Sequence, residues 1–263
     1  MFAALCRAAK TRPTSTLANP NDNHSRGFVQ LCPIEPNHRT AVLLFARSAN
    51  CEAKHKSFGL ARGQAARVHA SLRLHTLRVL RQTGLAIFEC AEQSQHGKSF
   101  GERISSAVAS VSDLGFTGVV VVGADTPGLR SSDVIKAASV VEQGENVLGR
   151  DLRGGVYLFG INLQLGSGFR QNSFEELPWQ LPNLGDAIYE FLQPGFELHR
   201  LGDLNARCDL MHLPKGLELV RVLKALFSEL QPVFPSRPAM CECKTGFGVS
   251  LTYRGPPTVR AAA

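Results

Sequence analysis

One carboxylate in this chain, Asp125, stands where α/β proteins commonly place a catalytic or metal-binding acid. It follows four consecutive valines, Val119 to Val122, and precedes a turn that contains Pro127 and Gly128. Such a β-branched run is typical of a central strand covered on both faces, and open α/β sheets bind ligands beyond the carboxyl ends of their strands. We therefore predict that Asp125 is catalytic and holds Mg²⁺ or Mn²⁺, which would offset phosphate charge. The alternative is that Asp125 only caps the turn.

Three cations follow the first predicted strand and could contact phosphate groups. Arg47, Lys54 and Lys56 lie in a polar, basic segment that we predict to be a loop from residue 47 to residue 57. Cationic side chains at this place would offset the negative charge of a nucleotide. An exposed basic loop without a ligand is the alternative, and the segment lacks the Gly and Pro that shape a tight loop. The predicted nucleotide-binding set is completed by Gly123 and Ala124.

Residues in the second half of the chain are candidates for an acceptor pocket. They are Arg153, Gly154, Gly155, Trp179 and Asp203. The two glycines would let a backbone approach a ligand closely, and Arg153 could bind a phosphate or carboxylate. Trp179 is the only tryptophan and could stack on a sugar or base, while Asp203 could follow another strand end. The alternatives are an ordinary turn with an exposed arginine, and a tryptophan that serves as a packing anchor.

The hydrophobic pattern predicts the elements that would bring these residues together. Apolar runs predict strands over residues 41–46, 85–90, 119–122, 146–149, 155–161 and 196–201. Helical spacing predicts helices over residues 62–82, 102–114, 184–192 and 217–230, and one more that Ser131 or Ser132 would cap. Because strands and helices alternate, we predict an α/β fold, a three-layer α/β/α sandwich with a mostly parallel central sheet.

Composition sets bounds on the domain organisation. The chain has 263 residues, and we predict one domain over residues 41–230 between a disordered basic leader, residues 1–40, and a disordered tail, residues 231–263. The net charge is +7, and each flanking segment contributes +3 of it. A basic total located in the flanks is poor evidence for a folded nucleic-acid surface, so we expect no specific nucleic-acid partner.

Several common classes of protein are disfavoured by the sequence. No apolar run is long enough to span a membrane, and the first residues are too weakly apolar for secretion. The seven cysteines form no zinc-site or disulfide pattern, so we expect reduced thiols and a cytoplasmic protein. The chain lacks three common motifs, G-x-G-x-x-G, G-x-x-x-x-G-K-[ST] and G-x-S-x-G. Their absence argues against a dinucleotide-binding protein, a P-loop protein and a hydrolase, respectively.

An ordered set of short motifs along residues 41–230 carries a family resemblance. The set comprises Phe45-Ala46-Arg47, Phe100-Gly101-Glu102-Arg103, Gly123 to Leu129, Val147-Leu148-Gly149, Gly154 to Ile161, Pro178-Trp179-Gln180 and Asp203 to Leu210. In these motifs the chain resembles a bacterial family of glycosyltransferase-A-like proteins, long catalogued as a domain of unknown function and tied by name to arsenosugar biosynthesis. The family is related to nucleotide-sugar and nucleotidyl transferases.

The resemblance implies a fold of glycosyltransferase-A type and a transferase activity. The expected reaction moves a sugar or a nucleotidyl group from an activated nucleotide to a small-molecule acceptor. The sequence departs from the family in its first loop and at Arg153, where the family has an Asp; the nearest carboxylate, Asp151, comes two residues earlier. These departures motivate the alternative, a non-catalytic descendant of the fold that binds a nucleotide or a partner.

Overall fold

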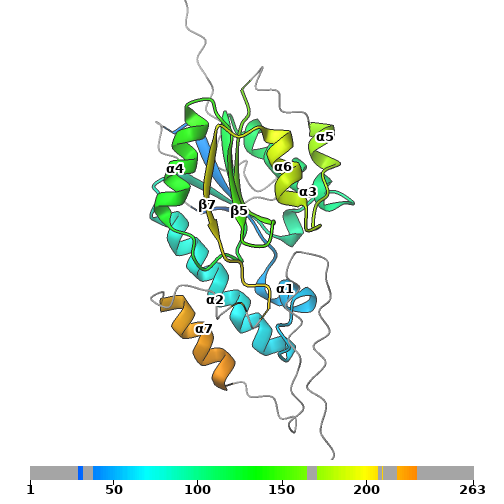
Figure 1. Ribbon diagram of the computed structural model, residues 1–263, viewed down its shortest axis with the longest axis vertical. Helices are drawn as coiled ribbons and strands as arrows, with labels where there is room; N and C mark the ends of the chain where they lie inside the picture. The colour runs from blue at the N-terminus through cyan, green and yellow to red at the C-terminus, as the bar shows by residue number, and fades with distance from the viewer. Residues whose placement is uncertain (1–28, 32–37, 165–170, 207–208, 210–217, 230–263) are drawn as a thin grey trace, which may run out of the picture.

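A seven-stranded sheet forms the centre of the molecule (Figure 1). The computed structural model describes residues 29–31, 38–164, 171–206, 209 and 218–229. The strands in chain order are β1 (Val29–Gln30), β2 (Thr40–Phe45), β3 (Ala86–Cys90), β4 (Gly118–Val122), β5 (Val147–Asp151), β6 (Val156–Asn162) and β7 (Phe196–Leu201). In space their order is β1-β3-β2-β4-β6-β5-β7.

Helices cover both faces of this sheet. They are α1 (Ala49–His55), α2 (Arg62–Arg81), α3 (Phe100–Asp113), α4 (Ser131–Glu142), α5 (Gln171–Glu175), α6 (Leu184–Leu192) and α7 (Glu218–Glu229), with a short 3-10 helix, η2 (Glu92–Ser94). Helices α2 and α4 pack on one face, and α3 and α6 pack on the other (Figure 1). Helix α7 lies against the outer side of α2. The predicted three-layer α/β/α arrangement is confirmed.

The core follows from the alternation of side chains along the inner strands. In β2, Leu43 joins the cluster beneath α3 and α6, whereas Val42 and Leu44 join the cluster beneath α2 and α4. The valines of β4 divide between the two clusters in the same way. A strand that is buried on both faces needs apolar residues at every position. This requirement explains why the run Val119 to Val122 could be recognised from the sequence.

Strand directions agree with the prediction of a mostly parallel sheet, with one interior exception. Strands β2, β3, β4, β5 and β7 run in the same direction, while β1 and β6 run against them. Strand β6 is reversed because the short turn after Asp151 folds it back on β5 as a hairpin. The sheet therefore contains both parallel and antiparallel strand pairs, but five of its seven strands run in the same direction.

The segment after β2 is the clearest correction to the sequence prediction. Residues 47–57 were expected to be a loop, but Ala49–His55 form helix α1. The side chain of Ser48 caps the helix by accepting a hydrogen bond from the backbone N–H of Cys51, and Glu52 lies in the first turn. The buried Ala53 faces the interior. A capped, amphipathic turn of this kind is too short to show helical periodicity.

The predicted boundaries of the domain are only partly covered by the described residues. Val29–Gln30 lie within the predicted leader, and they pair with β3 at the edge of the sheet. Most of residues 1–40 and all of residues 231–263 lie outside the described residues. The division of the chain into leader, domain and tail therefore stays a prediction, although this short part of the leader belongs to the sheet.

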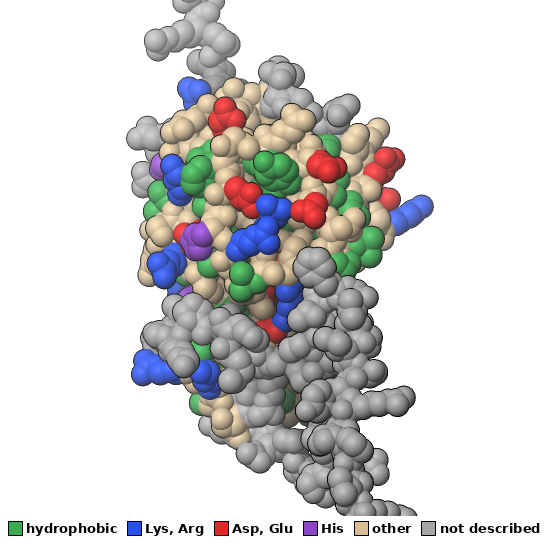
Figure 2. All heavy atoms as spheres, in the orientation of Figure 1, with side chains coloured by type: hydrophobic (Ala, Val, Ile, Leu, Met, Phe, Trp, Pro, Cys, Tyr) green, Lys and Arg blue, Asp and Glu red, His purple; other side chains and the backbone are tan. Residues whose placement is uncertain are grey.

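The described surface gives no sign of a basic interface on the face drawn in Figure 2. There, Lys and Arg side chains are interspersed with Asp and Glu among the coloured residues. Arg150, for example, donates to Glu197 at 2.6 Å and to Asp186 at 2.9 Å. In addition, none of the helices in the described part of the chain is long and apolar enough to cross a membrane.

Candidate functional site

The direction of the strands gathers several loops at one edge of the sheet. Strands β2, β4, β5 and β7 all end there, so the residues that follow them are neighbours in space. The chain moves from β2 to β3 on one side, and then returns to β4 on the other side of β2. A crevice at such a reversal of strand order is the usual ligand site of an open α/β sheet.

A cleft with two connected chambers opens at this edge. The small chamber encloses about 260 Å³ and is lined by Phe45, Ala46, Arg47, Glu52, His69, Arg73, Gln95, Phe100, Gly123, Ala124, Asp125 and Gln180. The large chamber encloses about 610 Å³, and its lining includes Lys56, Asp125, Asp151, Arg153, Gly155, Tyr157, Trp179, Asp203 and Asn205. Because Asp125 and five other residues line both chambers, they form one continuous cleft.

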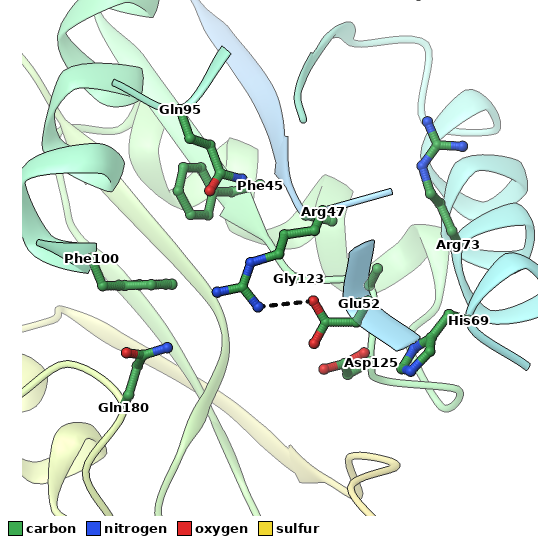
Figure 3. Close-up of a pocket in the computed structure, with 12 residues that line it drawn as sticks. Phe45, Arg47, Glu52, His69, Arg73, Gln95, Phe100, Gly123, Asp125 and Gln180 are labelled. Atoms are coloured by element: carbon green, nitrogen blue, oxygen red, sulfur yellow. Dashed lines mark hydrogen bonds and ion pairs between the residues drawn. The ribbon is translucent and has the colours of Figure 1, made fainter. Parts of the chain in front are cut away.

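Cationic side chains of the small chamber are held by carboxylates. Arg47 extends across the chamber and donates to Glu52 at 3.1 Å (Figure 3). Arg73, from α2, donates through Nε to the buried Glu89 of β3 at 2.9 Å. Both arginines are fixed before any ligand arrives, so their remaining N–H groups are available without a large loss of side-chain freedom.

The start of α1 is anchored to the end of β3, which fixes the backbone around Arg47. Glu92 accepts a hydrogen bond of 2.6 Å from the backbone N–H of Ser48 and a second one from its hydroxyl. Partial burial opposes ionisation of Glu92, but the hydrogen bonds from Ser48 outweigh it and leave the pKa of Glu92 below its usual value. The loop from β2 to α1 is therefore rigidly tied to the neighbouring strand.

Lys56 and Asp125 meet at the junction of the two chambers. The Nζ atom of Lys56 lies 2.9 Å from Oδ2 of Asp125. The Lys56 side chain is 14% exposed and that of Asp125 is 36% exposed, so the pair is reachable from the cleft. The carbonyl oxygen of Lys56 lies 2.8 Å from Nε2 of the buried His69. Because a carbonyl can only accept, His69 donates this hydrogen bond.

Two further carboxylates face the large chamber. Asp151 ends β5, and its Oδ1 accepts hydrogen bonds of 2.7 Å from the backbone N–H groups of Arg153 and Gly155. Asp203 follows β7 and accepts a hydrogen bond from the hydroxyl of Thr126. Burial, followed by the charges of Asp151 and Asp125, raises the pKa of Asp203 to about 7 against the hydrogen bond from Thr126. Asp203 is therefore partly protonated near neutral pH.

The turn of Arg153, Gly154 and Gly155 has mainly structural contacts. The Arg153 guanidinium donates to Asp209, which is buried. Gly154 adopts a φ of +90°, and its carbonyl accepts from the N–H of Gly185 at the start of α6 at 2.8 Å. The structure places Arg153 and Gly155 in the lining of the large chamber but does not place Gly154 there.

Trp179 packs against neighbouring aromatic residues and also borders the cleft. Its indole N–H donates to the carbonyl of Phe174 at 2.9 Å, and its ring lies 5.0 Å from that of Phe174 and 5.4 Å from that of Phe100. Trp179 also lines the large chamber. The sequence alternatives of a packing anchor and a ligand-facing aromatic are therefore compatible, because one side of the ring is packed while the residue still borders the cleft.

Most of the predicted site residues are brought together, and some important ones were not predicted. Lys54 is exposed and lines neither chamber. Asp151 was noted in the sequence only as the nearest carboxylate to the two glycines. Glu52 and His69 were not selected at all. His69 could have been noticed, because it is a polar residue on the apolar stripe of a helix, next to Val68.

The arrangement does not fit the predicted Mg²⁺ or Mn²⁺ ion at Asp125. In the described part of the chain, no group of three or more His, Cys, Asp or Glu side chains could hold a metal ion. Oδ2 of Asp125 is occupied by the ammonium group of Lys56, and Oδ1 of Asp151 is occupied by two backbone N–H groups. Mg²⁺ takes a near-octahedral shell of oxygen ligands, usually one or two carboxylates with waters and substrate phosphates, and the carboxylate oxygen that it would use at Asp125 is paired with Lys56.

Comparison with known proteins gives a family match and a shared fold. The family model described as an uncharacterised protein conserved in bacteria, DUF2064, matches residues 63–180, which is less than half of the chain. No curated protein matches the chain. A provisionally named nucleotide-diphospho-sugar transferase from Desulfovibrio desulfuricans G20 has a TM-score of 0.61 and 18% identity, over 73% of this chain and 98% of that one.

Two further structures lie at lower similarity. CMP:2-keto-3-deoxy-manno-octonic acid synthetase, solved in complex with CTP, has a TM-score of 0.37 and 10% identity over 73% of this chain and 99% of that one. A cytidylyltransferase from Leptospira borgpetersenii serovar Hardjo-bovis has a TM-score of 0.34 and 14% identity over 76% of this chain and 100% of that one. The fold conclusion rests on the Desulfovibrio protein: the chain shares the fold of that protein over 73% of its own length.

Proposed function

We propose that this protein binds a nucleoside-diphosphate sugar or a nucleoside triphosphate and transfers a sugar or nucleotidyl group to a small-molecule acceptor. The observation that carries this proposal is that Arg47, Lys56 and Asp125 all line the cleft at the ends of β2 and β4, with Lys56 paired to Asp125. A crevice at the reversal of strand order suits a nucleotide, and cations at its mouth suit phosphate groups.

In this proposal the nucleoside lies in the small chamber. The backbones of Ala46, Gly123 and Ala124 form part of its wall, and Phe45 and Gln95 supply an apolar surface and an amide. The phosphates then reach Arg47 and Lys56 near the junction of the chambers. Bringing a leaving group to fixed cations contributes to catalysis by positioning and by stabilising the charge that develops.

The acceptor lies in the large chamber, which has the greater volume and is lined by Asp151 and Asp203. Trp179 borders this chamber and is partly exposed, so it offers surface to a sugar ring or another small molecule. Asp203 is suited to accept a proton from an acceptor hydroxyl, because its pKa of about 7 matches a general base that works near neutral pH. The finer assignment to an arsenosugar-type glycosyltransferase stays a prediction.

A thermal-shift screen of the full chain tests this function. The ligands are UDP-, GDP-, CDP- and ADP-sugars and the corresponding triphosphates, each measured with Mg²⁺, with Mn²⁺ and with EDTA. We expect at least one nucleotide to raise the melting temperature and Asp125→Ala to remove that increase, since the Asp125 carboxylate holds the Lys56 ammonium group in place at the cleft. Absence of any shift with every nucleotide would contradict the proposal.

The second candidate is a nucleotide-binding protein without turnover, and one observation favours it. Arg153 stands where the resemblance predicts an Asp, and its guanidinium is engaged by Asp209. The two functions differ in product formation. If a nucleotide binds with micromolar affinity and no nucleoside diphosphate or pyrophosphate is released with any acceptor mixture, the second candidate is favoured; release of either product favours the transferase.

A further inference from the structure

We propose that the ammonium group of Lys56, a residue whose backbone carbonyl is held by His69, is the resident cation of this cleft, and that nucleotide binding therefore requires no divalent metal ion. This inference rests on the proposed function, because it concerns how the same site compensates phosphate charge. It replaces the metal ion that the sequence predicted at Asp125 with a side chain of the chain itself.

The position of Lys56 carries the first part of the argument. Its Nζ atom lies 2.9 Å from Oδ2 of Asp125, at the strand-end carboxylate where the predicted metal ion would bind. A divalent ion bound to this oxygen would face an ammonium group at close range, and like charges at such a distance repel strongly. In the structure the cation at this oxygen is Lys56, and a divalent ion would have to bind beside it or displace it.

The rigidity of Lys56 carries the second part. The backbone N–H of Lys56 donates to the carbonyl of Glu52 at 2.9 Å, at the end of α1. Its carbonyl accepts from the buried His69 at 2.8 Å, and the His69 ring lies 4.8 Å from the ring of Phe58. Both backbone groups of Lys56 are thus fixed, so that the side chain extends toward the cleft from a constrained position. His69 is a positioning residue here.

The hydrogen-bonding capacity of Lys56 allows it to act on a ligand. An ammonium group has three N–H donors, and Asp125 uses one of them. The remaining donors can reach phosphate oxygens in the cleft while Asp125 keeps the side chain in place. Arg47 lies in the adjoining small chamber and supplies a second cation for the same diphosphate. Each cation is paired with a carboxylate, Arg47 with Glu52 and Lys56 with Asp125, so both act on a phosphate through their remaining N–H donors.

Isothermal titration calorimetry on the full chain tests this inference. The probes are UDP, GDP, CDP and ADP, each titrated once in EDTA and once in Mg²⁺. For the wild type we expect the tightest nucleotide to bind with nearly the same Kd in both buffers. Lys56→Met removes a charge-assisted hydrogen bond and should weaken binding by about tenfold or more in EDTA. Lys136→Met, an exposed lysine of α4, is the matched control and should leave the Kd unchanged.

The outcomes separate the inference from the proposed function. Wild-type binding that appears only with Mg²⁺ overturns the inference while supporting the proposed function. No binding of any nucleotide in either buffer overturns the proposed function, and the inference with it. Unchanged affinity of a folded Lys56→Met protein in EDTA overturns the role of Lys56. If Lys56→Met does not fold, the comparison of buffers for the wild type still decides the question of metal dependence.

A separate variant pair tests the positioning role of His69. His69→Gln keeps a side-chain N–H donor that can reach the Lys56 carbonyl, whereas His69→Leu removes it. We expect the Leu variant to weaken nucleotide binding, measured as a higher Kd in titrations at constant temperature. The Gln variant should recover part of this loss. Equal losses in the two variants, or no loss in either, would show that His69 does not position Lys56.

Discussion

The backbone N–H of Gly155 donates to Oδ1 of Asp151 at 2.7 Å, and this bond closes the turn between β5 and β6. The N–H of Arg153 donates to the same oxygen, also at 2.7 Å. The turn thereby directs the Asp151 carboxylate toward the large chamber and folds β6 back along β5. The Asp151 carboxylate therefore stabilises the turn that reverses β6 and also faces the cleft.

The glycines of this turn should be sensitive to a single methyl group. At Gly155 a Cβ atom would lie 2.6 Å from Oδ2 of Asp151, and at Gly154, where φ is +90°, it would lie 2.8 Å from the carbonyl oxygen of Pro182. We expect either Ala substitution to lower the free energy of unfolding by about 1–3 kcal/mol. Urea denaturation measures this change. Gly63→Ala in α2, where a Cβ meets nothing within 4 Å, is the control and should not destabilise.

The stability of the protein should depend on the protonation of Asp203. Its pKa is raised from 3.8 to about 7, so the folded state binds more protons than the unfolded state between these values. The contribution of Asp203 to stability is therefore present at low pH and is lost as the pH rises through about 7. Asp203→Asn cannot titrate. We expect the melting temperature of the variant to rise relative to that of the wild type as the pH increases from about 4 to about 7, and the difference to stay constant above that range.

A parallel pH dependence of the two proteins would contradict this account of Asp203. The variant should keep the neighbouring fold, because an Asn oxygen can still accept the hydrogen bond from the Thr126 hydroxyl. Circular dichroism at each pH provides the control for secondary structure. Only the difference between the two melting curves bears on Asp203 and on the carboxylates coupled to it, Asp151 and Asp125, since more distant carboxylates contribute equally to both proteins.

Trp179 should report on the cleft, because it is the only tryptophan of the chain. Trp179→Phe removes the indole N–H that donates to the carbonyl of Phe174 and should lower the free energy of unfolding by about 1 kcal/mol. In the wild type, a ligand that fills the large chamber should change the intrinsic fluorescence. Saturable nucleotide or acceptor binding without any change in fluorescence would argue against a ligand next to Trp179.

The sequence predicted the layers of the fold because burial on both faces leaves a strong pattern. Strand β4 has valine at four successive positions, and helices α2 and α3 bury regularly spaced apolar residues. The helix α1 was missed because its seven residues are mostly polar, and its signals, the Ser48 cap and Glu52, are local. The reversal of β6 depends on a turn that Asp151 closes, which composition does not reveal.

The site was predicted in part for a similar reason. Asp125 was found because a strand ends just before it, and topology then fixes where it lies. Thr126 and Asp203, 77 positions apart, are brought together by the loops that follow β4 and β7, where the N–H of Leu204 donates to the carbonyl of Asp125 at 2.8 Å. Likewise, the contact of Lys56 with Asp125 depends on α1, which was not predicted. Pairings over such separations require the tertiary structure.

The location of a bound nucleotide tests the central claim most directly. The nucleotide that gives the largest thermal shift would be prepared with an azide on its base, photo-crosslinked to the full chain and mapped by mass spectrometry of proteolytic peptides. We predict label on the small chamber, at Phe45 to Arg47, at Gln95 or at Gly123 to Asp125, and loss of that label when unmodified nucleotide is added in excess. Saturable label found only outside these segments, or label that excess nucleotide does not displace, would contradict the account.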